Sequence, residues 1–252
     1  MVYGVDLGSR CVKIAAEDRV GFEFMGPFDT AGFYRRYIEP DTEGGKLRRD
    51  ELDLESEARM AATGYGRARL GRGAVMVPEL EAIIEGVKAL TGLSDALILD
   101  VGGQDSKALL MRKGRMEDFA ANDRCAASSG RFLENMSTAL GMNLEEMGRY
   151  WENPVELSST CAIFGETELV GLMGEGHKLQ DLAAGVNHAI VRRLLPLLSR
   201  FQADILILTG GVAHNQALRR LLVEARSVQV VVPDPPDFVA AVGCCRLARG
   251  LE

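Results

Sequence analysis

The sequence lacks the features that mark nucleic-acid-binding, membrane-spanning and secreted proteins. Acidic residues outnumber basic ones by 36 to 29, for a formal net charge of -7, so there is no basic excess to bind nucleic acid. No stretch approaches the ~20 apolar residues of a membrane-spanning helix. The first residues, MVYGVD, lack the basic and apolar regions of a signal peptide. We therefore expect a cytoplasmic protein that binds neither nucleic acid nor a membrane.

Cysteine is also scarce, with five in 252 residues. An odd number in a chain expected to be cytoplasmic argues against a disulfide framework. These sulfurs are instead expected to be buried, reactive or bound to metal. They belong to Cys11, Cys125, Cys161, Cys244 and Cys245.

An internal repeat is the first positive feature. Residues 2–16 (VYGVDLGSRCVKIAA) and 97–111 (LILDVGGQDSKALLM) share one plan: an apolar strand, an Asp-x-Gly turn and a second strand. The equivalent residues, each pair 94 positions apart, are Asp6 and Asp100, Gly8 and Gly102, and Lys13 and Lys107. Two matching units at a constant offset predict two similar lobes, which we place at residues 1–93 and 94–252.

The rest of the chain alternates predicted helices and strands, which indicates an α/β fold. Pro78 and Gly92 are typical of the start and end of a helix, and the residues between them have helical spacing. Residues 39–53 are polar and predict an exposed loop or short helix. The other predicted helices are 128–140, 161–173, 181–201, one around Leu218–Leu222 and one near the C-terminus; the other strands are 204–208 and 228–232.

Each Asp-x-Gly turn has the composition of a phosphate-binding loop. Gly8, Gly102 and Gly103 are expected to supply the positive φ of a tight turn and to let backbone N–H groups approach phosphate. A carboxylate beside a polyanion requires a cation between them. We therefore predict that Asp6 and Asp100 bind Mg²⁺ through its water ligands.

Polar neighbours complete the predicted catalytic and nucleotide-binding site. Ser9 is expected to donate to phosphate and Gln104 to orient an attacking water, while Lys13 and Asp105 are assigned to nucleotide binding. Asp-x-Gly is also common in ordinary hairpin turns, and one copy alone would favour that interpretation. The repetition favours a nucleotide site.

A third glycine-containing segment follows a predicted buried strand. Thr209-Gly210-Gly211 precedes a helix that carries Asn215, an arrangement found in other α/β nucleotide sites. Together with Ala240-Ala241-Val242-Gly243 it predicts an adenosine-binding wall. A lone Gly-Gly is weak evidence, so this assignment depends on the two Asp-x-Gly turns.

Longer motifs make a resemblance specific. The sequence resembles the activator component of 2-hydroxyacyl-CoA dehydratases and the related ATPase subunits of benzoyl-CoA reductases, in the acetate/sugar kinase, Hsp70 and actin superfamily. The resemblance covers nearly the whole chain. It rests on DLGS (6–9), ATGYGR (62–67), DVGGQD (100–105), FAANDRCAASSGRFLE (119–134), SSTCAIFGETEL (158–169), LTGGVAHN (208–215) and AAVG (240–243).

The resemblance implies a two-lobed actin-like ATPase with duplicated ribonuclease H-like lobes, a bound ATP or ADP, and Mg²⁺. It also implies a homodimer in which two cysteines of each subunit, here Cys125 and Cys161, hold one [4Fe-4S] cluster across the interface. Four thiolates complete such a cluster, and each cysteine precedes a predicted helix whose N-terminus would stabilise thiolate charge. The plainer interpretation, a buried structural thiol, is kept for Cys11, Cys244 and Cys245.

The implied partners are a ferredoxin- or flavodoxin-like electron donor and an iron–sulfur acyl-CoA dehydratase or reductase as acceptor. ATP hydrolysis would drive delivery of a low-potential electron. The motifs leave the acceptor open among a 2-hydroxyacyl-CoA dehydratase, a benzoyl-CoA reductase and a double-cubane cluster reductase.

Two loops depart from the family pattern, and two other classes of protein share the fold. Gly8-Ser9-Arg10 replaces the usual Gly-Ser-Thr, and Ser128-Ser129-Gly130 replaces the common Gly-Thr-Gly. One other class is a metabolite kinase, for which the chain has little room for a substrate-binding insertion. The second is a non-redox, actin-like ATP switch, which would bind no metal cluster.

Overall fold

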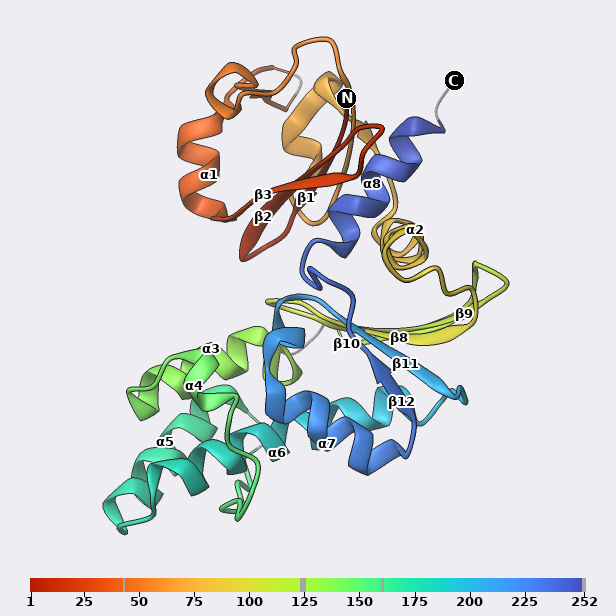
Figure 1. Ribbon diagram of the computed structural model, residues 1–252. Helices are drawn as coiled ribbons and strands as arrows, with labels where there is room; N and C mark the ends of the chain where they lie inside the picture. The colour runs from red at the N-terminus through yellow and green to blue at the C-terminus, as the bar shows by residue number, and fades with distance from the viewer. Residues whose placement is uncertain (43, 123–125, 160, 251–252) are drawn as a thin grey trace. The chain divides into compact units, whose positions relative to one another are not determined.

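A computed structural model describes residues 1–42, 44–122, 126–159 and 161–250 (Figure 1). The chain divides into two compact units, which are described separately. The first comprises Met1–Ser94, Met111–Met116 and Pro233–Glu252, and the second Asp95–Leu110 and Glu117–Val232. The division differs from the predicted one, 1–93 and 94–252, mainly because the C-terminal helix packs with the first unit.

The first unit is built on a five-stranded sheet in the order β3-β2-β1-β6-β7. β1 pairs antiparallel with β2 and parallel with β6, so that Asp6 lies beside Lys13 on one side and Thr63 on the other. The strands are β1 (Val2–Leu7), β2 (Cys11–Glu17), β3 (Phe22–Asp29), β6 (Arg59–Thr63) and β7 (Val75–Met76).

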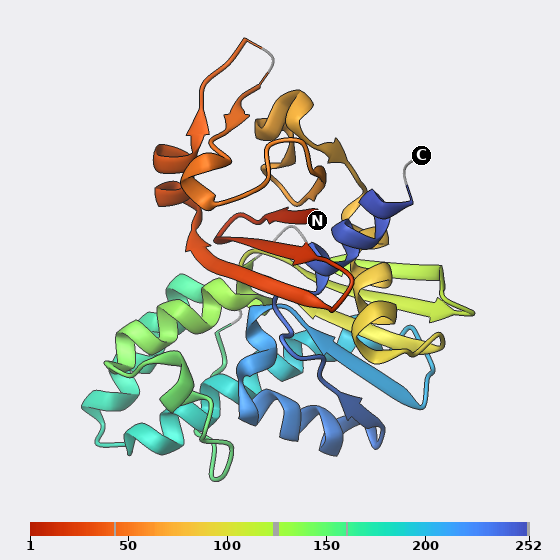
Figure 2. The same ribbon diagram turned by 45° about the horizontal axis from the view of Figure 1, so that its top comes forward.

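Alternate side chains of this sheet enter two different cores, as the two-residue period of a strand requires. Tyr3, Val5 and Leu7 pack with Phe33 and Tyr37 of α1 (Thr30–Tyr37). On the other face, α8 (Val239–Arg249) packs on β1, β2 and β6. A separate two-stranded sheet, β4 (Ile38–Glu39) with β5 (Lys46–Leu47), and the 3₁₀ helices η1 (Asp50–Leu52) and η2 (Arg67–Gly73) complete the unit (Figure 2).

Glycines let α8 pack directly against neighbouring backbone. A Cβ at Gly4 would lie 1.9 Å from the carbonyl oxygen of Ala241, and one at Gly86 of α2 (Glu79–Thr91) 1.8 Å from that of Val239. At its C-terminal end, α8 is held by ion pairs of Arg246 and Arg249 with the buried carboxylate of Glu17. These contacts explain why the C-terminal helix belongs to the first unit.

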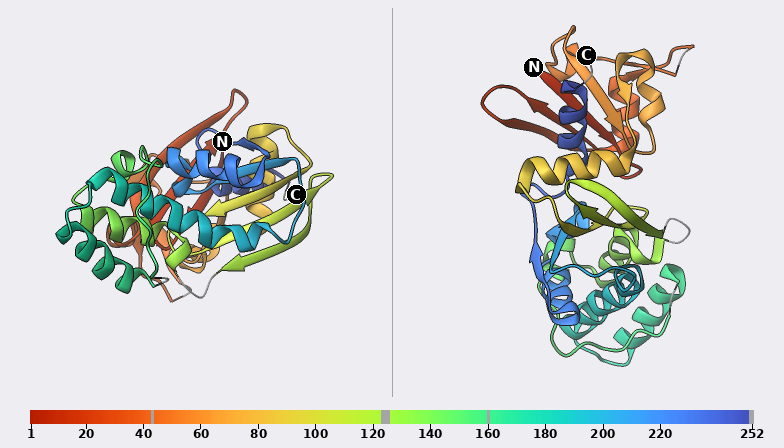
Figure 3. Two further views of the ribbon diagram at one scale, coloured as in Figure 1. Left: turned by 90° about the horizontal axis from the view of Figure 1, so that it is seen from below. Right: turned by 90° about the vertical axis from the view of Figure 1, so that its right-hand side faces the viewer.

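The second unit repeats the strand order of the first: β10-β9-β8-β11-β12. β11 pairs parallel with both β8 and β12. Helices α3, α6 and α7 contribute to its hydrophobic core, and α3, α4, α5 and α7 each contact α6 (Figure 3). The elements are β8 (Ala96–Val101), β9 (Ser106–Arg112), β10 (Arg115–Asn122), η3 (Ala126–Ser128), α3 (Gly130–Leu140), α4 (Leu144–Met147), α5 (Ala162–Gly174), α6 (Leu179–Leu198), β11 (Ile205–Thr209), η4 (Gly211–His214), α7 (Gln216–Arg226) and β12 (Gln229–Val231).

The predicted helices and strands are confirmed, with ends shifted by a few residues. The prediction of an exposed loop or short helix over residues 39–53 is only partly right, because they include the strand β5 as well as η1, and Leu47 and Leu52 are buried there. Helix α2 follows its N-cap Pro78 and ends at Gly92, which adopts a left-handed φ of 70°. In the parts of the chain that the structure describes, no helix combines the length and apolarity needed to cross a bilayer.

Gly86→Ala is expected to lower the free energy of unfolding by about 1–3 kcal/mol, because the added methyl group overpacks the contact between α2 and α8. The shift in the urea midpoint measures this effect. Gly21→Ala is the control, since a Cβ there meets nothing within 4 Å, and it should change stability by less than about 0.5 kcal/mol. Equal stability of the two variants would contradict the packing role of Gly86.

Candidate phosphate loops and cysteine segment

The first Asp-x-Gly loop places Asp6 in an ion pair. Its Oδ2 lies 3.3 Å from Nζ of Lys13, the residue opposite it on β2. Burial lowers the pKa of Lys13, but Asp6, together with Cys11 and Asp237, raises it, so that the pKa lies above its ordinary value. Lys13, predicted to bind nucleotide, is therefore a charged partner of Asp6 in this structure.

Two other segments hold the first loop. The hydroxyl of Thr30 donates to the carbonyl oxygen of Gly8 at 2.9 Å. The N–H of Gly66, in the ATGYGR motif, donates to the carbonyl oxygen of Leu7 at 2.9 Å. Gly64 has a φ of 86°, and a Cβ there would lie 2.7 Å from Oδ1 of Asp6. ATGYGR is thus the segment that closes over Asp6, and glycine is required at position 64.

The predicted reason for the loop glycines is wrong at two positions. Neither Gly8 nor Gly102 adopts a left-handed φ. Space explains them instead, because a Cβ at Gly8 would lie 2.8 Å from the carbonyl oxygen of Cys11, and one at Gly102 3.2 Å from Oδ1 of Asp105. A left-handed glycine does lie close to the second loop: Gly210, directly after β11, has a φ of 85°.

The second loop holds its aspartate differently. Asp100 lies beside Thr209 in the parallel pair β8–β11, and its Oδ1 accepts a hydrogen bond of 2.7 Å from the Thr209 hydroxyl. A Cβ at Gly210 would lie 2.3 Å from the carbonyl oxygen of Val101. Thr209-Gly210 therefore packs directly on the strand end that carries Asp100.

The turn after Asp100 is tight, because the N–H of Gly102 donates to the carbonyl oxygen of Asp105 at 3.0 Å. Asp105 pairs with the buried Lys107 at 2.7 Å. Gln104 is exposed and Ser9 half-buried, each at its own loop.

The carbonyl groups of this loop bind the start of α3. Gly130 N–H donates to Gly102 at 2.8 Å, and Arg131 N–H to Gly103 at 2.9 Å. The hydroxyl of Ser129 also donates to the Gly103 carbonyl, at 3.1 Å. The second loop and the N-terminus of α3 thus form one hydrogen-bonded unit.

Three residues of the predicted adenosine wall have different surroundings. Gly211 is exposed, and a Cβ there would meet nothing within 4 Å. Asn215 is buried; its Oδ1 caps α7 at Leu218 N, and its Nδ2 donates to Asn187 Oδ1. Gly243 lies against α2, where a Cβ would be 1.7 Å from the Ala82 carbonyl oxygen. Packing thus explains Asn215 and Gly243, and their role in nucleotide binding stays a prediction.

Cys161 is the N-cap of α5, as the sequence predicted for a residue just before a helix. The backbone N–H groups of Phe164 and Ile163, at the start of α5, hold the pKa of its thiol below the ordinary value. The side chains of Ile163 and Phe164 are 71% and 69% exposed. A half-buried thiol with a lowered pKa suits a metal-binding thiolate.

The remaining cysteines are distributed as follows. Cys125 lies outside the described residues. Cys244 and Cys245 are buried packing residues, as predicted, and burial raises the pKa of Cys245 to about 12. Cys11, predicted to be in the core, is half-buried on β2. Among the described residues, no three His, Cys, Asp or Glu side chains are grouped to hold a metal ion.

Sequence reasoning missed the residues that fix the chain just before Cys161. Glu168, in the middle of α5, accepts hydrogen bonds from Ser158 N and Oγ (2.8 and 2.7 Å) and from Ser159 N (2.9 Å). Partial burial opposes its charge, but these hydrogen bonds lower the pKa of Glu168 to about 2. The only signal was its place in the motif SSTCAIFGETEL.

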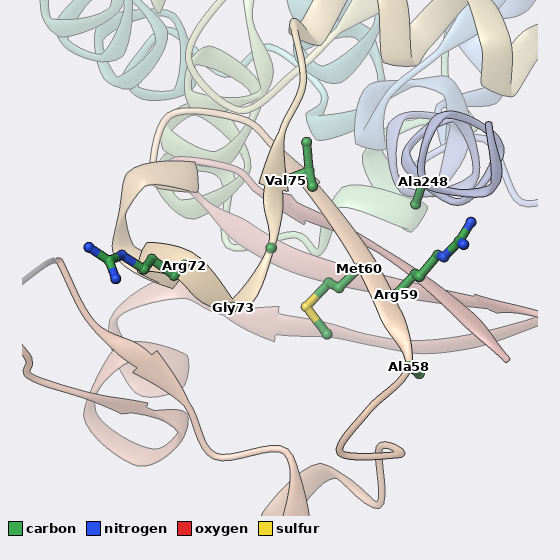
Figure 4. A pocket seen from close by; sticks show the side chains of 8 residues that line it. Ala58, Arg59, Met60, Arg72, Gly73, Val75 and Ala248 are labelled. Atoms are coloured by element: carbon green, nitrogen blue, oxygen red, sulfur yellow. The ribbon is translucent and has the colours of Figure 1, made fainter. Parts of the chain in front are cut away.

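The first unit has a hollow of about 280 Å³ (Figure 4). It is lined by Arg59 and Met60 at the start of β6, together with Arg72, Val75 and Ala248. Arg59 pairs with Val2, whereas Thr63 pairs with Asp6 at the other end of the same two strands. The hollow is therefore separate from the predicted site.

A model of the BadF/BadG/BcrA/BcrD ATPase family matches residues 43–248. The chain belongs to this ATPase family. A 2-hydroxyisocaproyl-CoA dehydratase activator of Clostridioides difficile is 32% identical over 255 residues, covering 97% of this chain and 93% of the relative.

Two solved structures of related proteins have the same fold. One is the activator of the 2-hydroxyisocaproyl-CoA dehydratase from Clostridium difficile with bound ADPNP; its TM-score is 0.82 at 29% identity, with 98% of this chain and 93% of that chain covered. The other is Acidaminococcus fermentans (R)-2-hydroxyglutaryl-CoA dehydratase component A, with a TM-score of 0.82 at 26% identity and 98% of both chains covered. The predicted family and the actin-like α/β fold are confirmed.

Cys161 is expected to react with iodoacetamide at lower pH than it does in the unfolded chain. Alkylation requires the thiolate, and the N–H groups of Ile163 and Phe164 stabilise that form only in the folded state. Peptide mass spectrometry of the metal-free protein between pH 5 and 10 measures the midpoint, with the guanidinium-unfolded chain as control. The buried Cys244 should stay unlabelled in the folded protein. A midpoint at or above that of the unfolded chain would contradict the assignment.

Proposed function

We propose that this protein is an ATP-driven electron donor, an activator that passes a low-potential electron to an iron–sulfur acyl-CoA dehydratase or reductase. Membership of an ATPase family and likeness to dehydratase activators support the general class. The observation that carries the redox part is Cys161, a thiol at a helix start with its pKa lowered by backbone N–H groups.

The two Asp-x-Gly loops are proposed to bind ATP with Mg²⁺. A related activator was solved with ADPNP bound. In this chain, Asp6 and Asp100 are the carboxylates proposed to bind Mg²⁺. Thr209 donates to Oδ1 of Asp100 at 2.7 Å and so orients this carboxylate, which is proposed to bind a water of Mg²⁺. Gln104, exposed at the turn, is proposed to orient the attacking water; Ser9, Gly103 and Gly211 are proposed to contact the nucleotide.

Cys125 and Cys161 of two copies of the chain are proposed to hold one [4Fe-4S] cluster. Such a cluster supplies one-electron chemistry at low potential. Cys161 fits as a ligand because its thiolate is favoured, and because the exposed Ile163 and Phe164 beside it suit a protein interface. A homodimer is proposed because each chain supplies two such cysteines and four thiolates complete the cluster.

Nucleotide can move the cysteine segment only if it binds one conformation more tightly than another. The hydrogen bonds of Gly130 and Arg131 to the second loop connect α3 directly to the loop whose conformation the nucleotide would select. The proposed donor is a ferredoxin- or flavodoxin-like protein. Dehydratase activators among the relatives favour a 2-hydroxyacyl-CoA dehydratase as the acceptor.

Anaerobically purified protein is expected to be brown and to contain about four irons per two chains, as four-thiolate ligation implies. Cys161→Ala and Cys125→Ala should each lose this iron and the visible absorbance. Cys11→Ala, which removes a half-buried thiol on β2, should keep both. A colourless wild type would favour the non-redox switch, and full iron in Cys161→Ala would refute the ligand assignment.

Asp100→Asn and Asp6→Asn are each expected to lower kcat for ATP hydrolysis by about 100-fold or more, because they remove the charge that holds Mg²⁺ against phosphate. The rate is measured as phosphate release at saturating Mg·ATP. Glu145→Gln, which alters an exposed carboxylate on α4, is the matched control and should leave kcat unchanged. Normal hydrolysis by both aspartate variants would contradict the proposed site.

A further inference from the structure

The chain just before Cys161 is held from three directions. Arg192 of α6 donates to the carbonyl oxygen of Leu157 at 2.8 Å, and Arg193 to that of Ser159 at 2.6 Å. Glu168 of α5 accepts from the N–H groups of Ser158 and Ser159. Contacts with α5 and α6 therefore fix the position of residues 157–159, the segment that precedes Cys161.

Arg193 also contacts α3. Its guanidinium carbon lies 4.2 Å from the ring centre of Phe132, and that ring is fully buried. A planar guanidinium can stack on an aromatic face and donate hydrogen bonds in its own plane at the same time. Arg193 therefore couples a residue of α3 to the carbonyl group of Ser159.

Phe132 lies in the first turn of α3, immediately after the two residues that bind the second phosphate loop. The N–H groups of Gly130 and Arg131 donate to the carbonyl oxygens of Gly102 and Gly103. A continuous series of contacts thus runs from Gly102 and Gly103 through Phe132 and Arg193 to Ser159. All of it lies within the second unit.

We propose that Arg193 is the positioning residue that transmits the nucleotide state of the Gly102–Asp105 loop to the segment carrying Cys161. The inference rests on the proposed function, in which the loop binds phosphate and Cys161 binds the cluster. A shift of the loop carries the start of α3 with it, because the hydrogen bonds are to the loop's own carbonyl groups. In a close-packed interior the displaced Phe132 ring moves the guanidinium stacked on it, and Ser159 follows.

The neighbouring arginine provides a matched comparison. Arg192 lies on the same helix and binds the same segment, at Leu157, so its removal also loosens the 157–159 segment. Its hydrogen bond does not run through the Phe132 ring. A role in coupling is therefore separable from a role in merely holding the segment.

The test is the rate at which a ferrous chelator, bathophenanthroline disulfonate, removes iron from the anaerobically purified full-length protein. The rate is compared in saturating Mg·ADP and saturating Mg·ADPNP. In the wild type we expect the two rates to differ by at least about fivefold, the lower end of usual coupling between sites. In Arg193→Ala the ratio should fall to about one, while Arg192→Ala should keep the wild-type ratio.

Arg193→Lys retains the charge without the planar stack and should give an intermediate ratio; it also serves if Arg193→Ala does not fold. An Arg193 variant that binds iron and retains the full wild-type ratio would overturn the proposal. So would equal rates in the iron-containing wild type. Wild-type protein without iron would instead refute the proposed function, so the two failures are distinguishable.

Discussion

The second unit depends on the hydrogen bonds that Gly130 and Arg131 donate to the carbonyl oxygens of Gly102 and Gly103. In a helix, the first N–H groups have no partner within the helix itself. Here the Gly102–Asp105 loop supplies two of those partners, so the loop caps the helix. The consequence is mechanical: α3 cannot move at its N-terminus without moving the loop or breaking these hydrogen bonds.

The two halves of the molecule share a strand order but differ in how they hold their aspartates. Asp6 pairs with the cation Lys13, whereas Asp100 accepts from the neutral hydroxyl of Thr209. The second loop is also the loop that binds the start of α3.

The fold was predictable wherever period or end signals were strong. The repeated Asp-x-Gly turns indicated two similar units, and Pro78 and Gly92 marked the ends of α2 correctly. The membership of α8 was not predictable. It depends on close contacts of Gly4 and Gly86 with carbonyl groups more than 150 residues away. Local sequence patterns do not predict contacts between segments so far apart in the chain.

The sequence predicted which residue types form the candidate site, but it predicted less well the structural reason for each of them. Gly8 and Gly102 are glycines because space is short, not because φ is positive. Glu168 and Arg193 were missed because their importance lies in contacts with Ser158 and Ser159, which only the packing of α5 and α6 brings within reach. A carboxylate and an arginine on predicted helices otherwise suggest solvated faces.

The central claim is that nucleotide bound at the two Asp-x-Gly loops changes the surroundings of the cysteine thiolates. Its most direct test is the reduction potential of the anaerobically purified protein, measured with Mg·ADP and again with Mg·ADPNP. The account predicts that exchanging the nucleotide shifts the potential by about 60 mV or more, equivalent to a tenfold change for one electron. Identical potentials with both nucleotides would contradict it.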